Sequence, residues 1–194
     1  HMLFMCFVYI NVWQIKKIHQ EDYDKITLGF NDCFGTATSP FSFSAEGESK
    51  IFLLFTFFGL GRDKIGKYKK LVKNRNEIAH SNGNIFFKAQ ATVDEKITEI
   101  LKFTNEIQEK TKSAIQDGFK KFLIESQDEE ERRYIDLKEQ INEELIHEHY
   151  MSQKDIEFCL DYDITMLSAE PNYAEIEKIF EALKAEYALE DVNV

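Results

Sequence analysis

Three residues near the middle of the chain, Arg75, Asn76 and His80, carry side chains suited to chemistry on a phosphate group. The guanidinium of Arg75 is always charged and can donate two parallel hydrogen bonds to phosphate oxygens. The imidazole of His80 titrates near neutral pH, so it can take up and release protons. An arginine that binds an anion close to a histidine that moves protons is the pair that phosphate chemistry uses.

These residues end a lysine-rich segment that we predict to be one helix, from about residue 63 to residue 80. Apolar residues at helical spacing predict its buried stripe: Ile65, Tyr68, Val72 and Ala79. Arg75 falls in the gap of this stripe, where a purely structural helix would carry an aliphatic residue. A buried guanidinium needs an anionic partner, which is either a ligand or an acidic side chain from another helix.

A polar ridge is expected along another side of this helix. Asn76 and His80 are four residues apart, and Lys69 and Lys73 continue the same line towards the N-terminus. We expect Lys69, Lys73 and the adjacent Lys70 to bind a phosphate backbone, with a simple solvated surface as the alternative. Arg75 and His80 are about 140° apart around an ideal helix, so one copy does not direct both at one phosphate. Either the helix is distorted, or two copies share the site.

The spacing of Arg75, Asn76 and His80 resembles the Arg-(polar)-x-x-x-His signature of the HEPN superfamily, whose helical domains are often ribonucleases. The resemblance covers about residues 21–124 and leaves residues 125–194 outside. It implies an all-α, HEPN-like helical bundle that forms a homodimer, with a composite site at the interface. The implied reaction is metal-independent cleavage of RNA by attack of the 2′-hydroxyl on the adjacent phosphate, with no cofactor.

Within that resemblance, His80 would be the general acid or base, Arg75 would hold the phosphate, and Asn76 would orient His80 or donate to the phosphate. The family also implies a toxin or antiviral effector, with an inhibitory partner protein such as an antitoxin. Members paired with a nucleotidyltransferase antitoxin often carry a tyrosine two residues after the histidine. Asn82 stands at that position here, so control by nucleotide transfer to a tyrosine is not expected.

The net charge of −11 would argue against a nucleic-acid partner if it were spread evenly along the chain. It is not evenly spread. Residues 125–194 hold 21 acids and 6 bases, or −15, which leaves 14 acids and 18 bases, or +4, for residues 1–124. Between Arg62 and His80 there are seven bases and two acids. The candidate site therefore lies in the basic part of an acidic chain.

Helical spacing and only two prolines favour an all-α fold, with a helical domain at residues 1–124 and an acidic helical extension at residues 125–194. Helices are expected over residues 21–34, 50–60 and 63–80, with a buried strand as the alternative for residues 50–60. A loop is expected between residues 35 and 49, with Phe41 and Phe43 folded back onto the body. A capping box at Thr92–Glu95 is expected to open a long helix that reaches Ile124.

The C-terminal extension should begin with a charged hinge at residues 127–133. A helix through Tyr134 and Leu145 follows, then a short helix capped by Ser152. Pro171 is placed to start the last helix.

Residues 3–18 are very apolar, but they are few for a membrane span, and we expect a buried helix or strand rather than a membrane anchor. His1-Met2 resembles an expression-vector remnant, so the chain could be part of a longer protein. Cys6, Cys33 and Cys159 lack the spacing of a metal site and are interpreted as reduced, buried thiols, as expected of a cytoplasmic protein.

Two other functions are compatible with the sequence. Glu77-x-x-His80 and Glu144-x-x-His147 both match the Glu-x-x-His pair of di-iron bundles, but the helices at residues 21–34 and 50–60 lack the further glutamates that such a site needs. We therefore expect no metal site. The second alternative is a non-catalytic module that binds RNA or protein, in which the acidic extension docks a basic partner or covers the polar ridge.

Overall fold

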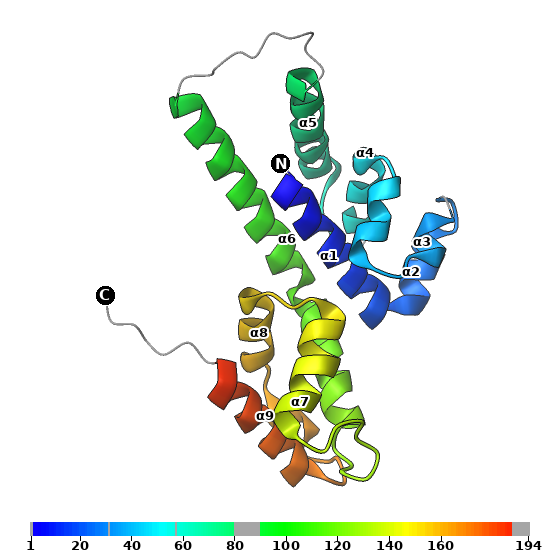
Figure 1. Cartoon of the computed structure of the whole chain (residues 1–194), viewed down its shortest axis with the longest axis vertical. Helices are drawn as coiled ribbons and strands as arrows, with labels where there is room; N and C mark the ends of the chain where they lie inside the picture. The colour runs from blue at the N-terminus through cyan, green and yellow to red at the C-terminus, as the bar shows by residue number, and fades with distance from the viewer. Residues whose placement is uncertain (1, 31, 57, 80–89, 188–194) are drawn as a thin grey trace. The chain divides into compact units, whose positions relative to one another are not determined.

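A computed structural model of the chain describes residues 2–30, 32–56, 58–79 and 90–187. Every element in those ranges is a helix, and none is a strand (Figure 1). The all-α fold class expected from the apolar spacing is therefore confirmed. None of the described helices combines the length and the hydropathy that crossing a membrane would require.

The chain folds into two compact units, residues 1–111 and residues 112–194. The division falls inside the longest helix, α6, which runs from Gln90 to Glu125. The sequence expectation placed this boundary at residue 124. Each unit has its own buried core and is described separately below.

The first unit is built from short and long helices, which precede the first part of α6. They are α1 (Met2–Ile18), α2 (Gln20–Thr27), α3 (Cys33–Thr36), the 3-10 helix η1 (Pro40–Ala45), α4 (Glu48–Ile51), the 3-10 helix η2 (Phe52–Thr56) and α5 (Arg62–Ala79). Aromatic rings from three of these elements and from α6 meet in the core. The ring of Tyr68 lies 4.7 Å from Phe103, 5.5 Å from Phe52 and 6.3 Å from Phe4.

One expected helix, over residues 21–34, is wrong, because α2 ends at Thr27 and α3 begins only at Cys33. Beyond this break, backbone carbonyls in and just after α3 accept hydrogen bonds from side chains of α1 and α2. Lys16 donates to the carbonyls of Phe34, Gly35 and Ala37 over 2.9–3.3 Å, and the Tyr23 hydroxyl also donates to Phe34. The ring of Phe34 is completely buried.

The single buried helix expected over residues 50–60 is also wrong. α4 ends at Ile51, and the tighter turns of η2 follow, so that Leu53 and Thr56 face solvent while Phe52 and Phe55 are buried. A 3-10 helix has three residues per turn, which separates these side chains differently from an α-helix. In the preceding segment, Phe43 is fully buried as expected, whereas Phe41 remains 49% exposed.

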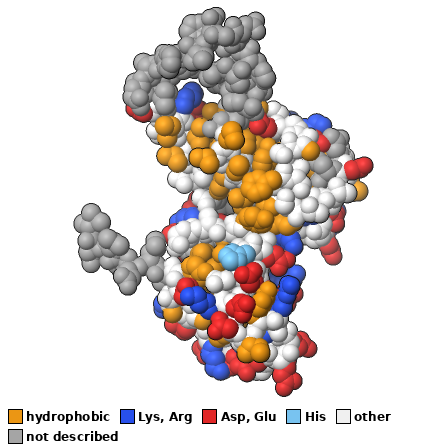
Figure 2. Space-filling view, viewed as in Figure 1, with side chains coloured by type: hydrophobic (Ala, Val, Ile, Leu, Met, Phe, Trp, Pro, Cys, Tyr) orange, Lys and Arg blue, Asp and Glu red, His pale blue; other side chains and the backbone are white. Residues whose placement is uncertain are grey.

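The first apolar segment forms α1, and one side of this helix enters the core through Phe4, Val8, Val12 and Ile15. The expectation of a buried element is only half correct, because Leu3 on another side is 86% exposed. Figure 2 shows hydrophobic side chains gathered on the face that α1 and the first half of α6 present to the viewer.

The second unit follows the middle of α6 with α7 (Leu137–Gln140), the π-helix η3 (Ile141–His147), α8 (Gln153–Leu160), the 3-10 helix η4 (Ile164–Leu167) and α9 (Tyr173–Tyr187). Its core includes the fully buried residues Ile115, Phe119, Cys159, Ile176 and Leu183. The expected cap at Ser152 is confirmed by reciprocal hydrogen bonds with Asp155. The last helix begins at Tyr173, two residues after Pro171.

The first residues of two other expected helices differ from those in the structure. α6 begins at Gln90, so Thr92 lies inside the helix and does not open it. The helix expected from Tyr134 begins instead at Leu137, capped by the Asp136 carboxylate, which accepts from the Glu139 amide. Helix ends depend on local capping bonds, which spacing alone does not specify.

The charged segment at residues 127–133 is not helical, as expected, but Arg132 fixes it to α9. The Arg132 side chain is only 4% exposed and donates to the Ser126 carbonyl at 2.6 Å and to Glu175 at 3.0 Å. Cys159 is a free buried thiol and Cys6 is a free, half-buried one. The side chain of Cys33 lies outside the described residues.

Candidate nucleic-acid interface

The buried stripe of α5 positions the candidate motif. Ile65, Tyr68 and Val72 are buried as expected, with exposed fractions of 5% or less. Arg75 and Asn76 belong to the last part of the same helix, which ends at Ala79. Position 75 therefore continues the line of Tyr68 and Val72, as the sequence predicted. The side chains of Arg75 and Asn76, and the whole of His80, lie outside the described residues.

A polar contact joins α5 to α6 on the N-terminal side of the candidate motif. The Lys64 ammonium lies 2.5 Å from the Glu106 carboxylate, and the Tyr68 hydroxyl donates to the same carboxylate at 3.3 Å. Burial alone would raise the pKa of Glu106, but the hydrogen bond and charge of Lys64 outweigh it, so this pKa is lowered. Burial, reinforced by the Glu106 charge, raises the pKa of Tyr68. At neutral pH, Glu106 is thus ionised and Tyr68 is neutral.

The three lysines predicted to bind RNA are divided between two sides of α5. Lys69 is half-buried and Lys73 is exposed, four residues apart on the side of the expected ridge. Lys70 instead lines a groove between α5 and α6, together with Lys67. At 3.6 residues per turn, Lys70 is turned about 100° from Lys69. The ridge and the groove are therefore separate surfaces.

The groove has a volume of about 430 Å³ and is lined by four lysines and two glutamates. Lys67 and Lys70 come from α5, and Glu95, Lys96, Glu99 and Lys102 come from α6. Lys96 is neutralised by Glu99 at 2.6 Å. Neither Lys67 nor Lys70 forms an ion pair with a carboxylate among the described residues. The groove thus carries a net positive charge, which attracts phosphate groups.

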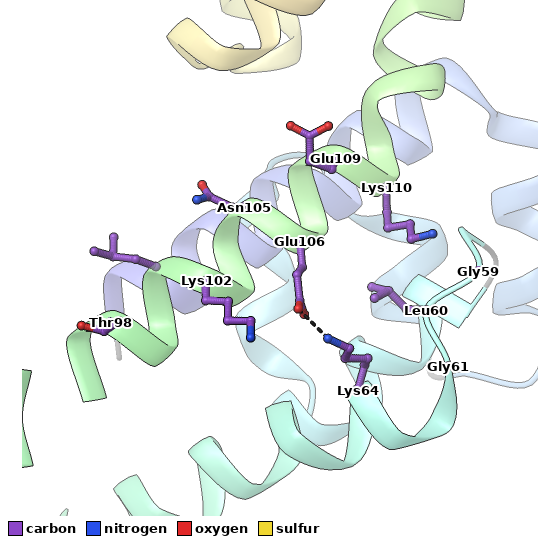
Figure 3. A pocket seen from close by; sticks show the side chains of 11 residues that line it. Gly59, Leu60, Gly61, Lys64, Thr98, Lys102, Asn105, Glu106, Glu109 and Lys110 are labelled. Atoms are coloured by element: carbon purple, nitrogen blue, oxygen red, sulfur yellow. Dashed lines mark hydrogen bonds and ion pairs between the residues drawn. The ribbon is translucent and has the colours of Figure 1, made fainter. Parts of the chain in front are cut away.

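A second, larger groove of about 830 Å³ adjoins the first, because Thr98 and Lys102 line both. It lies between the Gly59–Gly61 segment, the start of α5 and α6. Figure 3 shows the side chains of Lys64 and Lys102 on the same side of α6, with the ion pair between Lys64 and Glu106 joining α5 to α6. Asn105, Glu109 and Lys110 add further polar groups from α6. Together the grooves run along the α5–α6 contact, with charged groups at their edges and a lining that is mostly apolar.

The sequence did not single out Lys67 or Lys102 as candidates. Lys67 lies in the same lysine run as Lys69 but on the α6 side of the helix, a side that helical spacing could have separated from the ridge. Lys102 is far away in the sequence and joins the groove only because α6 packs against α5 through Phe103. No local pattern in the sequence points to such a pair.

Within the ranges that the structure describes, no three His, Cys, Asp or Glu side chains form a cluster that could hold a metal ion. Glu144 accepts a hydrogen bond from Gln140 at 2.7 Å, and the His147 imidazole lies 3.1 Å from Glu143. These two members of the second Glu-x-x-His pair are thus engaged with other side chains. The side chains of the first pair, Glu77 and His80, lie outside the described residues.

Comparison of the chain with protein-family models, with curated proteins and with solved structures gave no significant match to any of them.

Proposed function

We propose that the protein is a metal-independent endoribonuclease whose composite active site contains Arg75, Asn76 and His80 from two copies of the chain. The observation that carries this proposal is the Arg75-Asn76-x-x-x-His80 spacing at the end of α5, a helix with seven basic and two acidic residues. The resemblance to HEPN ribonucleases supports the reaction type. The lysines of the adjoining groove, Lys67 and Lys70, support a polyanionic substrate.

In the proposed reaction, the 2′-hydroxyl oxygen of one nucleotide forms a bond to the adjacent phosphorus while the bond from phosphorus to the 5′ oxygen breaks. His80 of one copy takes the proton from the 2′-hydroxyl, and the protonated His80 of the other copy gives a proton to the leaving 5′ oxygen. Arg75 stabilises the negative charge that develops on the phosphate oxygens. The products are a 2′,3′-cyclic phosphate and a 5′-hydroxyl end.

The two roles of His80 predict a bell-shaped dependence of the cleavage rate on pH, because one copy must be neutral and the other protonated. Asn76 would orient the imidazole or donate to the phosphate. The biological setting, a toxin or antiviral effector restrained by a partner protein, rests on the family resemblance alone.

The decisive experiment is incubation of the full chain with total RNA in the presence of EDTA. We expect cleavage by the wild type and a loss of roughly 100-fold or more in Arg75→Ala and in His80→Ala. His147→Ala is the matched control, because its imidazole is exposed in the second unit and should not affect the rate. Circular dichroism checks that each variant remains helical.

Two results would contradict the mechanism: cleavage that requires a divalent metal, or cleavage that survives both substitutions. The ends of the products provide a separate check. A 3′-hydroxyl end in place of the cyclic phosphate would show that water, and not the 2′-hydroxyl, attacks the phosphorus.

RNA binding without cleavage is the second candidate function, and the lysine-lined groove favours it independently of the motif. In that case Lys67→Ala would weaken RNA retention, whereas Arg75→Ala and His80→Ala would leave both RNA length and retention unchanged. The same incubation and a filter-binding measurement distinguish the two functions.

A further inference from the structure

The larger groove between α5 and α6 lies wholly in the first unit and has a mostly apolar lining. Leu60 and Leu101 contribute apolar side chains to it, and Leu101 is 58% exposed. The groove volume of about 830 Å³ is in the range of small-molecule sites, which are mostly apolar with a few polar groups. An RNA backbone instead binds to charged surface along its whole length, so this groove suits another class of ligand.

One wall of the larger groove is formed by a segment with two glycines, Gly59 and Gly61. A Cβ atom added to either glycine would meet no atom within 4 Å beyond its chain neighbours. Gly59 has a φ of +75°, which favours glycine, whereas the backbone at Gly61 lies outside this left-handed region. The wall at Gly61 is therefore open because it has no side chain, and a larger residue there would occupy open space without backbone strain.

The opposite wall is α6, whose lining residues run from Thr98 to Lys110. At 1.5 Å per residue these positions cover about 18 Å along the helix axis. An elongated ligand follows such a wall better than a compact one does. Each methylene group that an alkyl chain buries against the apolar lining adds to its affinity.

The charged residues of the larger groove determine which head group it favours. Lys64 and Glu106 form an ion pair at 2.5 Å. Figure 3 shows the side chains of Lys102 and Lys110 on the side of α6 that faces α5, whereas Glu109 points away from α5. Among the residues that the structure describes, neither Lys102 nor Lys110 forms an ion pair with a carboxylate. The charge left on this side of α6 is therefore positive, and an anion complements it.

The positive charge is greatest near Lys102, because this lysine also lines the smaller groove. Lys96 and Glu99 neutralise each other there, so that Lys67 and Lys70 outnumber the one further acid, Glu95. We propose that the larger groove binds an unbranched alkyl carboxylate, with the carboxylate at the Lys102 ammonium and the chain running along α6 towards Gly61. This inference assigns a ligand to the larger groove and does not rest on the ribonuclease reaction.

The test is isothermal titration calorimetry of the full chain with decanoate, decanol and decyltrimethylammonium, each below its critical micelle concentration. The three probes share one chain and differ in the charge of the head group. We expect decanoate to saturate one site per chain, decanol to bind roughly tenfold more weakly, and the cation to show no binding.

Two variants locate the head group and the chain. Lys102→Gln should weaken decanoate binding roughly tenfold while leaving decanol binding unchanged. Its matched control is Lys120→Gln, because Lys120 is exposed on the same helix but belongs to the second unit. Gly61→Leu should weaken binding of decanoate and not of hexanoate, whose shorter chain ends before this wall. Gly66→Leu is the control for it, because Gly66 is an exposed glycine of α5 with the same open space but outside the groove.

Absence of saturable decanoate binding, equal affinity for the three head groups, or unchanged decanoate affinity in either Lys102→Gln or Gly61→Leu would overturn the proposal. Binding to phosphatidylglycerol vesicles without binding of decanoate would overturn it as well and would assign the groove to a membrane surface. Lys102 and Gly61 are both exposed, so the variants should keep the circular dichroism of the wild type. Cleavage of RNA is measured separately, so the failure of either proposal leaves the other intact.

Discussion

Lys16 shows how a single buried charge can organise a loop. Its ammonium donates to three backbone carbonyls between Phe34 and Ala37, and lies 5.9 Å and 5.8 Å from the ring centres of Trp13 and Tyr23. Burial lowers the pKa of Lys16, whereas the charge of Asp24 opposes that shift. Without Lys16, the carbonyls of Gly35 and Ala37 would lose this donor, whereas that of Phe34 would keep the Tyr23 hydroxyl. A buried carbonyl without a donor is costly.

We therefore expect Lys16→Met to reduce the free energy of unfolding by about 2 kcal/mol or more, because it removes the donors but keeps a long apolar side chain. The measurement is urea unfolding followed by the fluorescence of Trp13, the only tryptophan of the chain. Lys25→Met is the control, since Lys25 is exposed and its ion pair with Asp22 is on the surface. Equal stability of Lys16→Met and the wild type would contradict the assigned role.

The groove lysines Lys67 and Lys102 give a second prediction at the scale of residues. If RNA phosphates bind there, Lys67→Ala and Lys102→Ala should each weaken RNA binding for all sequences alike. Each should also reduce the slope of log affinity against log salt by about 0.7. Filter binding at several salt concentrations measures both effects.

Lys120→Ala provides the control for that measurement, because Lys120 is an exposed lysine of the same helix α6 but belongs to the second unit. An unchanged salt slope in the two groove variants would place the RNA elsewhere, for example along the side of Lys69 and Lys73.

At the scale of elements, the contact between α9 and the charged segment before α7 depends on Glu175. This carboxylate accepts from Lys178 on its own helix and from Arg132 on the segment. The hydrogen bond from Lys178, followed by that from Arg132, lowers the pKa of Glu175 from its usual 4.5 to about 2. Because the pKa is lower in the folded state, ionised Glu175 stabilises the second unit above pH 4.5.

That stabilisation should disappear as the pH falls from about 4.5 to about 2. We expect the wild type to lose stability across this range, and Glu175→Gln to lose less of it, because its side chain does not titrate. Helix content followed by circular dichroism during urea unfolding at several pH values measures the difference. Parallel stability curves for the two proteins would show that other carboxylates control the acid sensitivity.

Removal of Arg132, the partner of Glu175, should reduce the free energy of unfolding more than the loss of a surface ion pair would. Arg132→Ala leaves Glu175 and the Ser126 carbonyl without their buried donor, so we expect a loss of about 3 kcal/mol in the second unit. Arg133→Ala is the matched control, because Arg133 is exposed beside it. If Arg132→Ala loses no more unfolding free energy than the control, the role assigned to Arg132 is contradicted.

At the scale of the whole molecule, the chain consists of two units with separate cores and opposite charge. We expect Lys16→Met to shift the unfolding transition seen by Trp13, and Arg132→Ala to shift the helix signal while changing the Trp13 signal little. Both units include part of helix α6. Coincident shifts of both signals in both variants would show that the units unfold together.

The sequence by itself determined the helical class, the buried stripe of α5, the position of Arg75 on that stripe and the separation of basic and acidic regions. These features follow from local spacing and composition, which a sequence displays directly. The capping box at Ser152 was predictable for the same reason.

Only the tertiary structure decided where Lys70 and Lys102 lie, because the groove forms from two helices that are brought together by Tyr68 and Phe103. It likewise decided how the carbonyls of Phe34, Gly35 and Ala37 are bonded, since their donor, Lys16, belongs to another helix. Long-range donors and helix pairing leave no periodic trace in the sequence. The roles of Arg75, Asn76 and His80 stay predictions of their spacing and await the cleavage experiment.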